Sequence, residues 1–229
     1  MIDPKPVADR LREIRARIAA AARRAGRDPA GITLVAVSKT READEIRAAV
    51  AAGQLDFGEN YAQELAAKRE ALADLPQLRW HMIGHLQRNK AKLLVPGIHV
   101  LQTIDSPKLI EVVERRLAEH DACLEVLIQV DVAGEEQKSG APPEEVPVLV
   151  AAIRACPHLR LRGLMVIPPF TAGAEESRPY FRALRELGAE LAPREGEREL
   201  SMGMSDTFEV AVEEGATIVR VGTAIFGER

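Results

Sequence analysis

The chain contains eight short apolar runs, and seven of them are followed by a segment whose apolar residues recur at helical spacing. A continuous apolar run of this kind is typical of a strand that is buried on both faces, as in a parallel sheet. The expected strands cover residues 32–38, 55–59, 78–84, 98–105, 123–132, 159–167, 199–205 and 217–223. The expected helices cover residues 5–26, 42–52, 61–72, 87–94, 107–120, 144–155, 175–190 and 207–214. This alternation predicts parallel strands that are joined by right-handed crossovers.

Eight such units close naturally into a barrel, and the length of 229 residues is close to the usual size of that fold. We therefore predict an α/β fold, a single (β/α)8 TIM-type barrel with an additional N-terminal helix. We expect one domain over residues 1–229, in which residues 1–30 carry the helix that packs on the barrel. An open, doubly wound sheet is the main alternative. Its dinucleotide-binding form is disfavoured, because no G-x-G-x-x-G follows the first expected strand.

Charge and hydropathy argue against several classes of protein. The formal net charge is −4, so we do not expect a nucleic-acid-binding protein. The N-terminus lacks the apolar segment of a secretory signal, and no apolar run is as long as a membrane span. We expect a cytoplasmic protein and, without a second domain, a monomer. Cys123 and Cys156 lack neighbours at metal-ligand spacing, so we interpret them as small buried hydrophobic residues.

Reactive side chains of a barrel belong at the carboxyl ends of its strands, and Lys39 directly follows the first one. A lysine that points into the barrel mouth is costly there unless its charge is paired or removed. A desolvated lysine amine is a nucleophile toward carbonyl groups and forms Schiff bases. The alternative interpretation is an ordinary solvated lysine at the end of a strand.

A second group of polar residues follows the last two expected strands, in SMGMSD and RVGT. Ser201, Ser205, Gly222 and Thr223 would bring hydroxyl and backbone N–H groups together where this fold often binds phosphate. The alternative is that these residue types only build turns. For Asp206, capping of the following helix is the simpler role.

Arg220 lies inside the last expected strand between two valines, so its side chain should face the barrel interior. A buried arginine needs a partner. A carboxylate such as that of Glu59 would serve, and so would the ring nitrogen of a bound cofactor. Together, a reactive lysine, a phosphate-binding corner and an interior arginine suggest pyridoxal 5′-phosphate (PLP) as the ligand.

Six segments resemble the YggS/PROSC family of PLP homeostasis proteins. They are LVAVSKT (34–40), FGENYAQE (57–64), WHMIGHLQRNK (80–90), KSG (138–140), GLMVIPP (163–169) and LSMGMSDTFEVAVEEGATIVRVGTAIFG (200–227). The resemblance implies one barrel like the N-terminal domain of alanine racemase, with PLP held as a Schiff base. In this sequence the corresponding residues are Lys39 for the Schiff base, Ser201, Ser205, Gly222 and Thr223 for the phosphate, Arg220 for the pyridine nitrogen, and Asn60 near the cofactor. Which of the two serines binds phosphate is left open.

The family resemblance implies a protein that buffers or delivers PLP, with effects on amino-acid and keto-acid balance and without efficient catalysis. PLP-dependent apo-enzymes would then be its partners. One alternative is a PLP-dependent racemase or lyase of low activity, and another is a barrel enzyme that acts on phosphate sugars. Lys138 is a candidate secondary acceptor for PLP, or else a solvated loop lysine. His81 and His85 are expected to be core or loop histidines, because a strand does not place residues four apart on one helical face.

Overall fold

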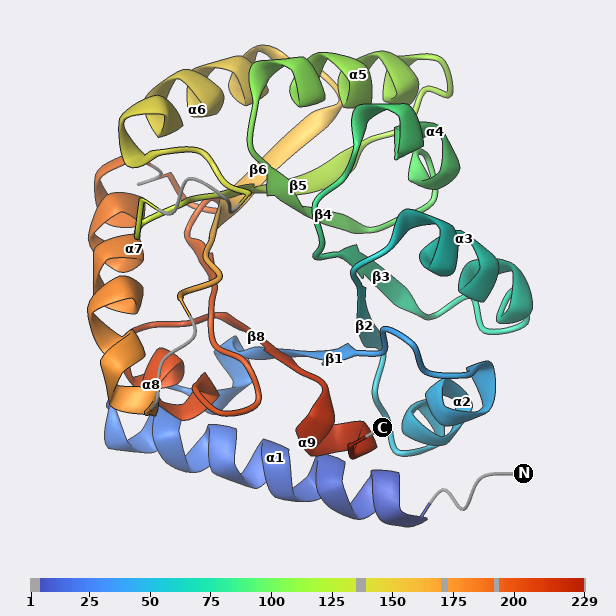
Figure 1. Cartoon of the computed structure of the whole chain (residues 1–229), viewed down its shortest axis with the longest axis vertical. Helices are drawn as coiled ribbons and strands as arrows, with labels where there is room; N and C mark the ends of the chain where they lie inside the picture. Colours follow the sequence, from blue (N-terminus) through green and yellow to red (C-terminus); the bar gives the residue numbers. More distant parts are fainter. Residues whose placement is uncertain (1–4, 135–138, 170–172, 192–193, 229) are drawn as a thin grey trace.

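Eight parallel strands form a closed barrel in the computed structural model, which describes residues 5–134, 139–169, 173–191 and 194–228 (Figure 1). Each strand pairs with the next in the sequence, and the last pairs with the first. The strands are β1 (Thr33–Val37), β2 (Asp56–Glu59), β3 (Arg79–Met82), β4 (Val100–Ile104), β5 (Leu124–Gln129), β6 (Leu159–Met165), β7 (Glu199–Ser201) and β8 (Ile218–Val221). The predicted (β/α)8 barrel is confirmed.

Helices surround the barrel (Figure 1). They are α1 (Lys5–Arg24), α2 (Ala43–Ala51), α3 (Ala62–Ala71), α4 (Ala91–Leu94), α5 (Pro107–Ala118), α6 (Val146–Ala155), α7 (Arg178–Leu191), α8 (Phe208–Glu213) and α9 (Thr223–Phe226). Short 3₁₀ turns are η1 (Pro29–Gly31), η2 (Arg88–Lys90), η3 (Pro143–Glu145) and η4 (Ala174–Ser177). The predicted N-terminal helix, α1, packs against α2, α8 and α9. That residues 1–229 form one domain stays a prediction.

Three elements differ from expectation. The helix expected over 87–94 is a 3₁₀ turn, Arg88–Lys90, followed by one short helix that ends at Leu94, where Val95 is extended. The strand expected over 199–205 ends at Ser201, and the chain then turns through Gly203 at φ +91°. Helix α9, directly after β8, was not predicted.

Side chains of the strands alternate between two apolar layers. The inner layer fills the barrel with Val35, Val100, Leu127, Met165 and Ile218. The larger outer layer lies between the strands and the helices. On β1, Leu34 and Ala36 belong to the outer layer and Val35 to the inner one. The same alternation carries Val37 and Lys39 toward the interior and Ser38 toward the helices.

The two cysteines do not match the prediction that both are buried. Cys123 is exposed, with its sulfur 3.7 Å from Nη2 of Arg160, and Cys156 is partly buried. Cys123 precedes β5 at the amino end of the barrel, so neither apolar layer covers it. Desolvation raises the pKa of the Cys156 thiol. Within the part of the chain that the structure describes, no helix is both long and apolar enough to cross a bilayer.

A buried ion pair attaches α3 to the carboxyl ends of β1 and β2. Nζ of Lys68 lies 2.7 Å from Oε1 of Glu59 and 2.6 Å from Oε1 of Glu64, and it also donates to the carbonyl of Ser38. Glu59 is fully buried, and its Oε2 has no hydrogen-bond partner among the described residues. Desolvation therefore raises the pKa of Glu59, although Lys68 and Ser38 oppose the shift.

This raised pKa predicts a stability that falls with pH over a defined range. Between the ordinary value of 4.5 and the raised value, the folded state holds the Glu59 proton more often than the unfolded state does. Stability therefore decreases as pH rises through this range, by at most about 1.4 kcal/mol per pH unit. Glu59→Gln should lack this pH dependence. In urea unfolding, the free energy of unfolding of the wild type should therefore fall relative to that of the variant as pH rises through this range. Glu70→Gln, which removes an exposed carboxylate of α3, is the control. A wild type whose free energy of unfolding rises relative to that of Glu59→Gln over the same range would contradict the prediction.

Candidate cofactor site

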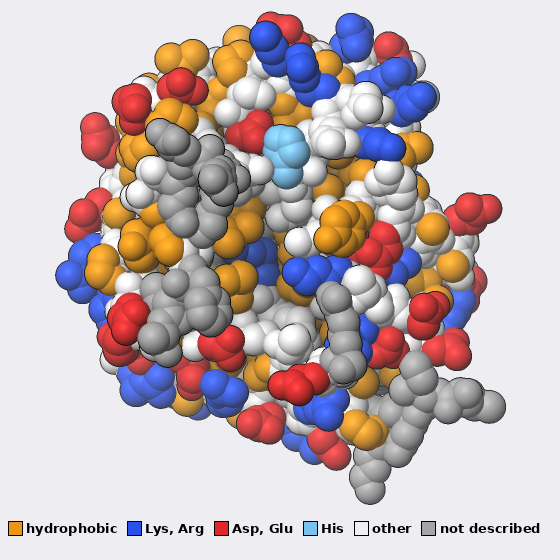
Figure 2. All heavy atoms as spheres, in the orientation of Figure 1, with side chains coloured by type: hydrophobic (Ala, Val, Ile, Leu, Met, Phe, Trp, Pro, Cys, Tyr) orange, Lys and Arg blue, Asp and Glu red, His pale blue; other side chains and the backbone are white. Residues whose placement is uncertain are grey.

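A cavity of about 340 Å³ lies at the carboxyl ends of the strands. Its lining residues are Val37, Lys39, Asn60, Ile83, Ile167, Met204, Ser205, Asp206, Arg220, Gly222 and Thr223. Six of the seven residues predicted for the site are among them, and Ser201 is not. Figure 2 shows this face of the molecule with Lys and Arg side chains among apolar ones near its centre. The volume lies within the range of small-molecule pockets, about 300–1,000 Å³.

Lys39 reaches the cavity because the backbone on both sides of it is held by residues of β2 and α3. Ser38 donates its N–H to the carbonyl of Gly58, at 3.0 Å, and its hydroxyl to Glu59, at 2.7 Å. After Lys39, Thr40 takes the left-handed conformation at φ 61° and donates its N–H to Glu64. These contacts restrict the stem from which the partly buried Lys39 side chain extends.

The corner after β7 and β8 brings Ser205, Gly222 and Thr223 together. The N–H of Gly222 lies 3.3 Å from Oγ of Ser205, and the hydroxyl of Thr223 donates to the same oxygen at 3.1 Å. Gly203 makes the preceding turn possible, since a Cβ there would lie 2.5 Å from Cβ of Ala211. Two hydroxyl groups and the Gly222 amide thus gather at one end of the cavity.

Two roles expected near this corner are not seen. Thr207, and not Asp206, occupies the cap position of α8, so the predicted capping role of Asp206 is wrong. Asp206 is instead exposed at the cavity. Ser201 is fully buried beneath the corner, where it bonds to Gln102 and Arg220. The geometry therefore separates the two serines, with Ser205 at the cavity and Ser201 below it.

Arg220 faces the interior, as predicted, but not toward Glu59. It donates to Oγ of Ser201 at 2.6 Å and to the carbonyl of Val166 at 2.8 Å. Glu59 lies on the outer face of β2, where it pairs with Lys68, so the suggested pair with Arg220 is wrong. Burial lowers the pKa of Arg220 to about 10, which leaves the guanidinium charged near neutral pH.

Asn60 lines the cavity at the end of β2, and a glycine makes room for it. A Cβ on Gly84 would lie 2.2 Å from the carbonyl oxygen of Asn60, so only glycine permits this approach. Four apolar lining residues were missed by the sequence reasoning, which considered polar side chains only: Val37, Ile83, Ile167 and Met204. The signal that could have found them is position, because Ile83 and Ile167 also follow strands at this end.

His81 and His85 do not line the cavity. His81 is buried in β3 and contacts Asp56, whereas His85 is exposed and contacts Asp105 at 3.1 Å. The two histidines are therefore core and rim residues, as predicted. Lys138 falls outside the described residues.

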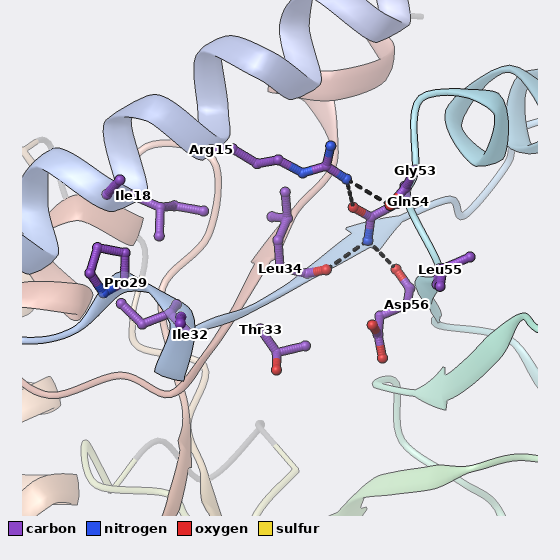
Figure 3. Close-up of a pocket in the computed structure, with 12 residues that line it drawn as sticks. Arg15, Ile18, Pro29, Ile32, Thr33, Leu34, Gly53, Gln54, Leu55 and Asp56 are labelled. Carbon is purple, nitrogen blue, oxygen red and sulfur yellow. Dashed lines mark hydrogen bonds between the residues drawn. The ribbon is translucent and has the colours of Figure 1, made fainter.

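A second cleft, of about 500 Å³, lies at the amino end of the barrel between α1, β1 and the start of β2 (Figure 3). Its Arg15 is already bonded to Gln54 and to the carbonyl groups of Ala52 and Gly53. Gln54 in turn donates to the carbonyl groups of Leu34 and Asp56. None of the predicted site residues lines this cleft.

Comparison with known proteins identifies the family. The family described as "Alanine racemase, N-terminal domain" matches residues 10–229. A pyridoxal phosphate homeostasis protein of Pseudomonas aeruginosa is 46% identical over 223 residues, which cover 97% of this chain and 96% of that one. One of Aquifex aeolicus is 44% identical over 228 residues, with 96% and 97% covered.

Among solved structures, PipY of Synechococcus elongatus with PLP bound has a TM-score of 0.85 and 38% identity, with 96% of this chain and 100% of that chain covered. Alanine racemase of Corynebacterium glutamicum has a TM-score of 0.67 and 20% identity, with 98% and 60% covered, and shares the fold. The chain thus belongs to the family of the alanine racemase N-terminal domain, alongside the pyridoxal phosphate homeostasis proteins.

Proposed function

We propose that this protein binds PLP in the cavity at the barrel mouth and acts in PLP homeostasis, by holding and releasing the cofactor rather than by catalysis. The observation that carries the proposal is one cavity lined by an amine, a guanidinium and a group of hydroxyls, from Lys39, Arg220, Ser205 and Thr223. The names of relatives more than 40% identical, and the PLP bound to PipY, support the same ligand.

The chemistry of the lining residues fits the three polar parts of PLP. The amine of Lys39 would attach the aldehyde covalently, and the hydroxyls of Ser205 and Thr223 with the amide of Gly222 would bind the phosphate. Arg220 remains protonated and would donate a hydrogen bond to the ring nitrogen, which keeps that nitrogen unprotonated. When bound, PLP supplies an aldehyde that traps amines. Asn60 would lie beside the cofactor, and Ile83, Ile167 and Met204 would pack against its ring.

Three further properties belong to the proposal. PLP-dependent apo-enzymes would receive the cofactor, because an imine to lysine is reversible and can be exchanged for one to another amine. The protein would act as a monomer in the cytoplasm. Lys138 would serve as a secondary acceptor while PLP enters or leaves.

Lys39→Ala tests the covalent attachment. Borohydride reduction of the PLP-loaded wild type should fix one adduct on Lys39, located by mass spectrometry of peptides. The variant should lose this adduct and bind PLP roughly 100-fold more weakly, a change of about 2.7 kcal/mol. Lys108→Ala, on the exposed surface of α5, is the matched control and should keep the adduct. An undiminished adduct elsewhere in Lys39→Ala would contradict the assignment.

The phosphate corner is tested by the choice between PLP and pyridoxal, which lacks the phosphate. Ser205→Ala combined with Thr223→Val removes two hydroxyls at the corner, so PLP affinity should fall about tenfold or more, while pyridoxal affinity changes little. Equilibrium titration of both ligands measures the ratio. Ser106→Ala, a serine outside the cavity, is the control. Equal losses for the two ligands would place the phosphate elsewhere.

The absence of efficient catalysis is tested by exchange of the α-hydrogen of amino acids. In deuterated water, a panel of amino acids should exchange no faster with the PLP-loaded protein than with free PLP, as followed by NMR. Racemases and related enzymes need acid–base groups that act on the α-carbon, so they exchange this hydrogen with many turnovers. Multiple turnovers that disappear in Lys39→Ala would favour the enzymatic alternative.

A further inference from the structure

A chain of four hydrogen bonds runs through the barrel interior from Arg220 to Asp56 at the opposite end. Arg220 lies 2.6 Å from Oγ of Ser201, which lies 2.6 Å from Oε1 of Gln102. Nε2 of Gln102 lies 3.0 Å from Nδ1 of His81, whose Nε2 lies 3.0 Å from Oδ1 of Asp56. We call these five residues the interior relay.

The members of the interior relay come from five strands and are shielded from water. Arg220, Ser201, Gln102 and His81 are at most 3% exposed. Strand register pairs Ser201 with Met165 and Ile218, which belong to the inner apolar layer. Asp56 lies in the second cleft, with its carboxylate turned away from Arg15 (Figure 3).

With the Gln102 amide oxygen toward Ser201 and its nitrogen toward His81, the donors and acceptors of the interior relay have one consistent direction. A guanidinium has donors only, so Ser201 accepts from Arg220 and gives its own proton to the amide oxygen of Gln102. The amide nitrogen of Gln102 must then donate to Nδ1 of His81. His81 is therefore neutral, carries its proton on Nε2 and donates it to Asp56.

This direction matters for the charge of Arg220. Among the described residues no carboxylate bonds to this guanidinium, and a lone buried cation is costly. Every link of the interior relay presents its acceptor end to Arg220, and the chain ends at a carboxylate. Aligned links of this kind polarise one another in a low-dielectric interior. Asp56 is not free for other uses, since it also lies 3.3 Å from Nε of Arg79.

We propose that Gln102, His81 and Asp56 are positioning residues for Arg220, and that they orient its guanidinium toward the ring nitrogen of the bound cofactor. The part that concerns the cofactor rests on the proposed function, whereas the direction of the interior relay does not. Two of the five guanidinium N–H groups are bonded to Ser201 and Val166. The orientation they impose determines where the other N–H groups point in the cavity.

The direction is tested without cofactor by NMR of protein that carries ¹⁵N-labelled histidine. The sequence contains five histidines, and His81→Gln identifies the signals of His81. At neutral pH, His81 should be the neutral tautomer with its proton on Nε2. Gln102→Leu should remove the bond to Nδ1 and move that nitrogen's shift. A proton on Nδ1, or an imidazolium, in the wild type would overturn the proposal.

The effect on the site is tested with PLP-loaded protein at fixed pH. Gln102→Leu should shift the absorption maximum of the bound cofactor and weaken PLP binding about tenfold. Gln129→Leu is the matched control, because Gln129 is also a buried glutamine but bonds to the carbonyl of Ser139. It should leave the spectrum unchanged. His81→Gln can accept from Gln102 and donate to Asp56, so it should retain the wild-type spectrum, whereas His81→Leu should not.

The outcomes separate the two proposals. A wild type without a reducible adduct on Lys39 would overturn the proposed function and leave the NMR result to decide the direction of the interior relay. A wild type with that adduct, together with identical spectra and affinities for Gln102→Leu and Gln129→Leu, would overturn the positioning role alone. A melting curve shows whether Gln102→Leu still folds. If it does not, the comparison of the cofactor spectra of His81→Gln and His81→Leu tests the positioning role instead.

Discussion

The alternation of side chains along closed, parallel strands is the constraint on which the site depends. In a closed barrel every strand has one face toward the interior, so a residue's position in its strand decides whether it reaches the cavity. Along β1 and the two residues after it, this constraint directs Val35, Val37 and Lys39 inward and the hydroxyl of Ser38 outward to Glu59. The amine of Lys39 and the outward contact of Ser38, the residue before it, therefore lie on opposite faces of this strand end.

The same constraint explains how a buried cation persists in the interior. A carboxylate beside Arg220 would neutralise it but would also compete for its N–H groups. The structure has a serine hydroxyl and a peptide carbonyl there, and the nearest carboxylate of the hydrogen-bonded chain is Asp56, at the far end of the barrel. A bidentate carboxylate would occupy two N–H donors as these two acceptors do, but it would also neutralise the guanidinium, which the neutral acceptors do not. The arrangement leaves the charge available at the cavity.

Much of the fold could be predicted from sequence because its signals are local. Apolar runs, helical spacing and the glycines that end helices are each recognised from a few neighbouring residues. A barrel then places the carboxyl ends of all its strands on one side. The orientation of Lys39 and Arg220 followed from that rule. The partner of Glu59 did not, because it depends on which face of β2 the carboxylate occupies and on Lys68, nine residues further along a helix. Cys123 was mistaken for a core residue since its apolar neighbours in sequence lie inside the strand and it does not. The interior relay joins five strands by side-chain contacts that no local pattern records.

Helix α1 has a consequence for how the chain reaches its final form. Its apolar residues Leu11, Ile14 and Ile18 are buried, and α1 packs on α8 and α9 as well as on α2. Strand β1 likewise pairs with β8. During synthesis α1 and β1 therefore leave the ribosome well before α8, β8 and α9, and their surfaces stay uncovered until those later segments follow. The nascent chain therefore exposes an unpaired strand edge and an apolar helix face through most of translation. Exposed surfaces of this kind are prone to aggregate and are what chaperones bind.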